Sequence, residues 1–289
     1  MQRRLAVVLL ALLTAMLMMA AEVVRPNVLV TSDEGIDAPV LVAPVDALKV
    51  DYRITVVAPA DDQSAMGHGI TYRTPVLVEV RPGTEGVRRF PVHAQLPTCT
   101  DIAATALLAT DPPALVLSGI NRGDNADLSV WISGTVAGAR EGALAIFPPV
   151  AFSTVTPRGS ALDYAAAARR ARMVLLRLRE AGLRAPGRVV KVEIPHPAGE
   201  VRGVTVTRAS MAPAKEERYE EKAGPGGERM FVNRYMPSER DAAGTDVQAF
   251  AGGFVAVTPL SLDQTDYRGL PALMAIPWCS FEPTAKATP

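Results

Sequence analysis

Four side chains with oxygen donors each stand shortly after an apolar run of this sequence. They are Asp33, Glu34, Ser64 and Asn121. Two carboxylates with a hydroxyl and an amide make a hard oxygen set, which suits Mg²⁺, Mn²⁺ or Ca²⁺ better than zinc. In an open α/β sheet, ligands bind beyond the carboxyl ends of the strands. The spacing therefore predicts that these side chains converge on one metal site.

A candidate phosphate cradle lies further along the chain. Ser133-Gly134-Thr135 immediately precedes a helical pattern. Backbone N–H groups and the helix dipole at such a turn attract anions, and a glycine lets an oxyanion approach the backbone closely. A divalent cation that faces a helix N-terminus suits phosphate ester hydrolysis, because both stabilise charge on the transferring phosphoryl group.

Each of these features also has a purely structural interpretation. Acidic residues after a strand, and a Ser-Gly-Thr turn before a helix, often serve only as helix caps. Asn121 could simply hold a turn. His68, between two glycines, is either a general acid or an exposed loop histidine. On spacing alone, the sequence indicates an α/β protein that binds phosphate or a metal.

The elements that would position these residues alternate along the chain. Five short runs rich in Val, Ile and Leu lack polar alternation and predict buried parallel strands: Val28-Thr31, Ile54-Ala58, Leu115-Ser118, Val150-Ser153 and Val189-Ile194. Helical patterns fall between them, at Ala38-Val50, Asp101-Ala109, Thr135-Ile146 and Ser160-Ala181. This alternation predicts an α/β fold with a doubly wound, mostly parallel sheet.

Two of the helical patterns carry boundary signals. Pro44 should kink the first helix or delay its start. In the last helix, Ser160 is the expected N-cap, Asp163 lies in the first turn, and Gly182 is the expected C′ residue.

The character of the chain changes after Pro197. Val204-Arg208 and Arg229-Arg234 are predicted strands on either side of a charged stretch, Lys215-Lys222, which we interpret as a solvated hairpin arm. A short helix at Asp246-Ala251 and a strand at Phe254-Thr258 follow. The tail after Phe281 is expected to be disordered.

The composition fits a globular protein and argues against a nucleic-acid binder. The chain has 289 residues with 48% apolar content, and 30 basic residues balance 30 acidic ones, so no net field attracts polyanions. Cys99 and Cys279 lie far apart without metal-type spacing. They either pair in an oxidising compartment or remain buried thiols.

The N-terminal segment is typical of a secretory signal peptide. Arg3 and Arg4 form a short positive region, and the apolar run Leu5-Ala20 precedes small residues. The run is short for a stable membrane span, which needs about 20 apolar residues. We expect cleavage near Ala20 to Glu22 and export to the periplasm, with an uncleaved anchor or a cytoplasmic location as the alternatives.

Several strings of the sequence resemble those of the SurE family. Val28-Leu-Val-Thr-Ser-Asp-Glu-Gly-Ile-Asp-Ala-Pro39 is similar to the family opening ILVTNDDGIDAP. Gln63-Ser-Ala-Met-Gly-His-Gly-Ile-Thr71 resembles QSGxGxxIT. Ser118-Gly-Ile-Asn-Arg-Gly-Asp-Asn125, with Ser133-Gly-Thr-Val136, resembles SGINxGxN…SGTV. The similarity continues in order through Thr245-Asp246 and Val257-Thr-Pro-Leu260.

The resemblance implies a Rossmann-like domain whose C-terminal hairpin and tail embrace a partner subunit in a homodimer or homotetramer. It also implies a nucleotidase that uses Mg²⁺ or Mn²⁺ and acts on nucleoside 5′- or 3′-monophosphates. The family's metal ligands map onto Asp33, Ser64 and Asn121, and its second aspartate maps onto Glu34. Asp33 and Asn121 are the expected catalytic residues. We assign five further residues to substrate binding: Ser133, Gly134, Thr135, Asn125 and His68.

The sequence departs from the family pattern at several of these places. Family Asn, Asp, Gly, Asp and Tyr are replaced by Ser32, Glu34, Ala65, Cys99 and Ile132. We therefore predict an exported metal-dependent phosphomonoesterase and keep two alternatives. One is a nucleotide- or phosphate-binding protein of the same fold with weakened catalysis, and the other is a scaffold whose main activity is dimer-mediated interaction.

We divide the sequence into four segments. Residues 1–21 are the signal peptide and residues 22–199 the catalytic domain. Residues 200–281 form a hairpin and oligomerisation extension of the same domain, and residues 282–289 are a disordered tail.

Overall fold

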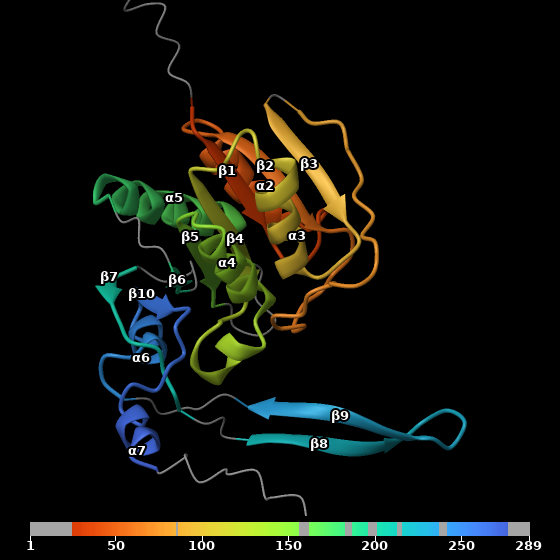
Figure 1. The fold of residues 1–289 in the computed structure, drawn as a ribbon, viewed down its shortest axis with the longest axis vertical. Helices are drawn as coiled ribbons and strands as arrows, with labels where there is room; N and C mark the ends of the chain where they lie inside the picture. The colour runs from red at the N-terminus through yellow and green to blue at the C-terminus, as the bar shows by residue number, and fades with distance from the viewer. Residues whose placement is uncertain are drawn as a thin grey trace, which may run out of the picture.

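An eight-stranded sheet forms the centre of the molecule (Figure 1). The computed structural model describes residues 25–84, 86–155, 162–182, 187–195, 201–212, 216–236 and 242–276. The strand order is β3-β2-β1-β4-β5-β6-β10-β7. The first six strands are parallel, and β10 runs antiparallel to β6. Their bounds are β1 (Asn27–Thr31), β2 (Arg53–Pro59), β3 (Val87–Val92), β4 (Leu115–Arg122), β5 (Pro149–Thr154), β6 (Arg188–Ile194), β7 (Gly203–Val206) and β10 (Phe254–Ser261).

Helices cover both faces of this sheet, which confirms the doubly wound α/β prediction. On one face, α2 (Pro39–Leu48) and α5 (Tyr164–Glu180) share a core with the central strands. On the other face lie α3 (Leu96–Ile102), the π-helical turn η1 (Ala103–Leu107) and α4 (Gly134–Leu144). Because both faces are covered, the central strands are buried throughout and show no polar alternation.

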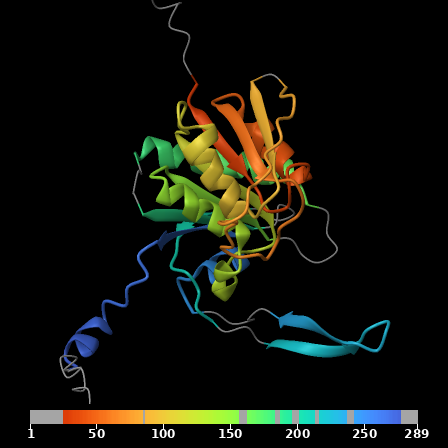
Figure 2. The same ribbon diagram turned by 45° about the vertical axis from the view of Figure 1, so that its right-hand side comes forward.

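The C-terminal part adds β10 and β7 to the edge of the sheet, and its hairpin and last helix lie away from the sheet. The short helix α6 (Asp246–Ala251) precedes β10, as predicted. A separate hairpin, β8 (Glu216–Ala223) paired with β9 (Arg229–Met236), extends from the body, and α7 (Leu270–Met274) projects in another direction (Figure 2). Every residue of β9 is exposed.

The structure refines the predicted elements at several places. The charged stretch after residue 215 is strand β8, which pairs with β9 and confirms the interpretation as a hairpin arm, whereas β7 joins the main sheet. Strand β3 was not predicted. Helix α3 begins at Leu96, with Pro97 in its first turn, instead of at Asp101. Asp163, not Ser160, is the N-cap of α5, because its side chain accepts a hydrogen bond from the Ala166 N–H at 2.8 Å.

Pro44 neither delays the start of α2 nor ends it. The helix begins at Pro39 and contains Pro44 in its interior. The predicted C′ glycine of α5, Gly182, has a φ of 63°, as that position requires.

Some predictions lie outside the described residues. They are the signal peptide, Cys279 and the tail after Phe281. Cys99 is a buried free thiol. Across the described ranges, every helix is too short or too polar to cross a membrane.

Candidate metal and phosphate site

Asp33 is the buried centre of the candidate site. It follows β1 and is only 3% exposed. Its Oδ1 atom accepts a hydrogen bond from the Thr135 hydroxyl at 2.8 Å, and its backbone carbonyl accepts one from the Gln63 N–H at 2.7 Å. Asp33 therefore ties the end of β1 to the N-terminus of α4 and to the loop after β2.

The predicted phosphate cradle contacts Asp33 itself. Ser133 caps α4, with its Oγ accepting from the Val136 N–H at 3.0 Å. A Cβ atom on Gly134 would lie 2.6 Å from Oδ2 of Asp33. Only glycine leaves room for this carboxylate, so the start of α4 is built around the negative charge of Asp33.

Glu34 points to the end of β4. Its Oε1 accepts a hydrogen bond from the backbone N–H of Arg122 at 2.8 Å. The residue before the acid pair, Ser32, is buried, and its Oγ is the acceptor for the Glu34 N–H at 3.4 Å. The acid pair therefore bridges β1 and β4, the two strands at which the sheet order reverses.

Ser64 is held by a carboxylate that the sequence analysis did not select. Both its N–H and its hydroxyl donate to Oδ1 of Asp62, at 2.8 and 2.6 Å. The hydroxyl oxygen keeps its lone pairs for another partner. The next residue, Ala65, has a φ of 60° where the family has glycine, so this loop keeps a left-handed backbone at a cost of about 1 kcal/mol.

Asn121 lies inside β4, beyond an irregularity. The register between β4 and β5 shifts between Ser118 and Asn121. Gly119 has a φ of 116°, and a Cβ there would lie 2.2 Å from the Phe152 carbonyl oxygen, so only glycine fits. The Asn121 amide donates to the Gly123 carbonyl at 3.1 Å, which leaves its own carbonyl oxygen for another donor or cation.

Two predicted substrate-binding residues have their contacts elsewhere. Nε2 of His68 lies 2.5 Å from Oε1 of Glu141, on a later turn of α4. Asn125 is buried. Its side-chain amide donates a hydrogen bond to the Ser153 hydroxyl at 2.6 Å, and its backbone N–H donates one to Oε1 of Glu193 at 3.1 Å. The structure gives neither residue a direct contact with the acid pair.

A buried charge cluster that was not predicted from the sequence lies next to Asn125. Lys191 is 0% exposed, and its Nζ lies 3.2 Å from Glu193 Oε1 and 2.7 Å from Asp246 Oδ2. Its only signal was a Lys and a Glu that alternate with apolar residues in a strand otherwise read as buried.

Negative charge accumulates around Asp33. Burial raises the pKa of the Asp33 carboxyl, the hydrogen bond from Thr135 opposes this, and the charge of Asp62 adds to the rise. Burial also raises the pKa of Glu34. The hydrogen bond from the Arg122 N–H opposes this rise, and the charges of Asp33 and Asp62 add to it. A cation between these groups would relieve both effects.

The donor set fits a hard divalent cation. Within the described ranges, no three His, Cys, Asp or Glu side chains form a ready-made metal cluster. The candidate set instead combines two carboxylates, both with a pKa raised by burial, with the free lone pairs of Ser64 and Asn121. Such a set favours Mg²⁺ or Mn²⁺ over zinc.

Comparisons with known proteins agree with this architecture. The family model described as "Survival protein SurE" matches residues 28–216. The protein named 5′-nucleotidase SurE 1 of Thermus thermophilus is 36% identical over 250 residues, covering 86% of this chain and 97% of that protein. The 5′-nucleotidase SurE of Geobacter sulfurreducens is 33% identical, covering 90% and 97%.

A solved structure gives the same result for the fold. The SurE protein of Aquifex aeolicus matches with a TM-score of 0.74 and 29% sequence identity, covering 86% of this chain and 98% of that one. On the evidence of sequence and structure together, the chain belongs to the SurE family.

Proposed function

We propose that this chain is a divalent-metal-dependent phosphomonoesterase that hydrolyses nucleoside 5′- or 3′-monophosphates. The observation that carries the proposal is the carboxylate of Asp33, set at the N-terminus of α4, whose pKa is raised by burial and further by the charge of Asp62. A helix N-terminus and a cation would together stabilise a phosphoryl group. The relatives named 5′-nucleotidase support the substrate class.

Each residue of the site would have a role that follows from its position. Asp33, Glu34, Ser64 and Asn121 would hold the cation through their oxygens. When bound, it supplies polarisation of the phosphoryl oxygens and lowers the pKa of the attacking water. Thr135 fixes the orientation of the Asp33 carboxylate through its hydroxyl, so this ligand needs no reorganisation during the reaction.

A direct assay tests the proposed function. The purified full chain is incubated with each nucleoside monophosphate and Mg²⁺ or Mn²⁺, and phosphate release is measured. We expect hydrolysis that EDTA abolishes and added metal restores. Hydrolysis that persists in EDTA would refute the metal dependence, and the absence of hydrolysis with every nucleotide and metal would refute the function.

One observation favours a weakened binding protein as the second candidate. Oε1 of Glu34 is already engaged by the Arg122 N–H, whereas a ligand of Mg²⁺ must meet near-octahedral geometry at about 2.1 Å. A chain that binds a nucleotide tightly in calorimetry, without turnover, would support this candidate.

We predict that Glu34→Asp raises Mg²⁺-supported kcat. Glutamate extends its carboxylate by roughly 1.3 Å relative to aspartate, and a misplacement near 1 Å can cost about a hundredfold in rate. The shorter side chain would release the Arg122 N–H and restore the family geometry. In the unchanged protein, activity should be low with Mg²⁺ and higher with Mn²⁺, which tolerates less regular geometry.

Steady-state kinetics and Mn²⁺ titration by electron paramagnetic resonance measure this effect. Glu180→Asp is the matched control, since Glu180 pairs with Arg177 on the surface. If Glu34→Asp lowers activity with both ions, the glutamate is adapted to this site and the argument fails.

We further propose that the protein is exported and forms a homodimer or homotetramer. The apolar run Leu5-Ala20 supports export, and sequencing the N-terminus from the native host tests it. Exposed apolar side chains on the projecting hairpin and on α7, including Phe231 and Met274, support assembly. Light scattering that gives a monomer mass would reject the assembly.

A further inference from the structure

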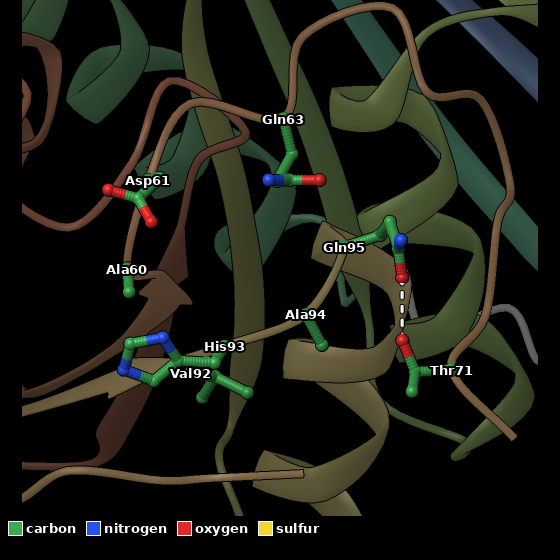
Figure 3. Close-up of a pocket in the computed structure, with 8 residues that line it drawn as sticks. All are labelled: Ala60, Asp61, Gln63, Thr71, Val92, His93, Ala94 and Gln95. Carbon is green, nitrogen blue, oxygen red and sulfur yellow. Dashed lines mark hydrogen bonds between the residues drawn. The ribbon is translucent and has the colours of Figure 1, made fainter. Parts of the chain in front are cut away.

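A polar pocket of about 250 Å³ opens beside the candidate site, at the ends of β2 and β3. Figure 3 shows the side chains that line it, among them Asp61, Gln63, Thr71, His93 and Gln95. None of them was selected as a site residue from the sequence, and the reaction proposed above uses none of these side chains. The pocket is therefore a separate feature that needs its own explanation.

One short loop connects the pocket to the candidate metal site. The backbone N–H of Gln63 donates to the Asp33 carbonyl at 2.7 Å, and the next residue is Ser64. Figure 3 shows the Gln63 side chain extending from this loop toward the centre of the group. A ligand whose phosphate lies at Asp33 would thus have its remaining part close to this pocket.

The pocket wall is held in place by regular structure. The Ala60 N–H donates to the Val92 carbonyl at 2.8 Å, which joins the ends of β2 and β3. The Thr71 N–H donates to Thr98 Oγ1 at 2.9 Å, which fixes the facing loop to α3. The site is therefore largely formed before any ligand binds.

Two side-chain amides give the pocket paired donors and acceptors. The Thr71 hydroxyl donates to Oε1 of Gln95 at 2.7 Å, which orients that amide and leaves its NH₂ group for a ligand. In the described part of the chain, the Gln63 amide has no protein hydrogen bond. A glutamine amide can pair with the edge of a base through one donor and one acceptor.

The volume limits what can enter. Pockets for drug-sized ligands span roughly 300–1,000 Å³, so this smaller space suits one heterocyclic ring system. A sugar phosphate without a base would leave the amides of Gln63 and Gln95 hydrogen-bonded only to water.

We propose that this pocket binds the base of the nucleoside monophosphate, and that Gln63 and Gln95 recognise its hydrogen-bonding edge. The inference rests on the proposed function for the position of the phosphate. It adds a determinant of base selectivity that lies outside the metal site.

The test compares a substrate that has a base with one that lacks it. Gln95→Glu keeps the acceptor for Thr71 but replaces the NH₂ donors with a carboxylate, and Gln63→Ala removes the second amide while keeping the N–H to Asp33. We expect each variant to lower kcat/KM for the preferred nucleoside monophosphate about tenfold, mainly through KM. Hydrolysis of ribose 5-phosphate should change less than twofold.

A second measurement separates this inference from the proposed function. Binding of the free nucleosides to the metal-free full chain is followed by saturation-transfer NMR, with Gln264→Glu as an exposed control. Nucleoside binding that both variants weaken supports the pocket even if no phosphate ester is hydrolysed. Equal losses with ribose 5-phosphate, or unchanged nucleotide kinetics and nucleoside binding, would overturn it.

Discussion

Asp33→Asn is expected to lower kcat/KM for nucleoside monophosphates by well over tenfold, a loss above roughly 1.4 kcal/mol of transition-state stabilisation. The amide keeps the shape of the side chain and can still accept the Thr135 hydroxyl at Oδ1. It removes a nearly buried negative charge that faces α4 and acts on the neighbouring Glu34. A hard cation requires that charge.

The design keeps a structural explanation apart from a catalytic one. Asp33→Asn should unfold no more easily than the unchanged protein, since burial raises the pKa of Asp33 and a neutral group avoids that cost. Asp46→Asn, at an exposed ion pair with Lys49, is the matched control and should keep full activity. A variant that retains more than a tenth of kcat/KM would mean that Asp33 is not a primary ligand.

The parallel core could be predicted because its strands are buried on both faces. Runs such as Val28-Thr31 are apolar without interruption, and their ends bring the acid pair and Asn121 to one edge of the sheet. Strand β3 gave no such signal. It contains Arg88, Arg89 and Pro91, and it is the last strand of the sheet, paired on its outer side only through isolated bridges with residues 78 and 81.

In the C-terminal part, the charged stretch was correctly interpreted as a hairpin arm, but its pairing with β9 was not predicted. The residues of β8 are mostly charged, and they form a strand because they pair with β9 in an exposed hairpin. Propensity alone does not select strand there, since pairing with a neighbour decides it. The contact of Tyr235 with Asp127, at 3.1 Å, joins the hairpin to the body and is invisible in the local sequence.

Within the candidate site, residue types were predictable and contacts were not. The family strings indicated Asp33, Ser64 and Asn121, but nothing in them placed the Ser64 hydroxyl on Asp62. The predicted cradle also contacts the Asp33 carboxylate, which only the three-dimensional approach of β1 to α4 shows. These contacts join segments far apart in the chain, and local patterns carry no information about them.

The buried cluster around Lys191 should dominate the stability of the C-terminal half of the sheet. Lys191→Met is expected to lower the free energy of unfolding by about 3–5 kcal/mol, because it leaves buried carboxylates without a counter-charge. Both Glu193 and Asp246 lie within hydrogen-bonding distance of the lysine, and all three side chains are 0% exposed. Burial alone would lower the pKa of Lys191, but Glu193 and Asp246 outweigh it and leave that pKa raised, so the lysine stays charged.

The pH dependence identifies the cause of this loss. Burial raises the pKa of Glu193 to about 7, Lys191 opposes the rise, and Asp124 adds to it. A carboxyl whose folded pKa is raised contributes stability below its unfolded pKa near 4.5, and that contribution disappears as the pH rises through the folded value. Without Lys191 the folded pKa rises further, so the deficit of Lys191→Met should be larger at pH 8 than at pH 5.

Urea unfolding at both pH values measures this deficit, with Lys49→Met as the control. Lys49 forms an exposed ion pair with Asp46, and its loss should cost less than about 1 kcal/mol at either pH. Lys191→Met combined with Glu193→Gln should recover part of the stability at pH 8, because one of the two unpaired charges is then removed. A deficit for Lys191→Met that is equal at pH 5 and pH 8 would point to lost packing of the side chain and would refute the electrostatic account.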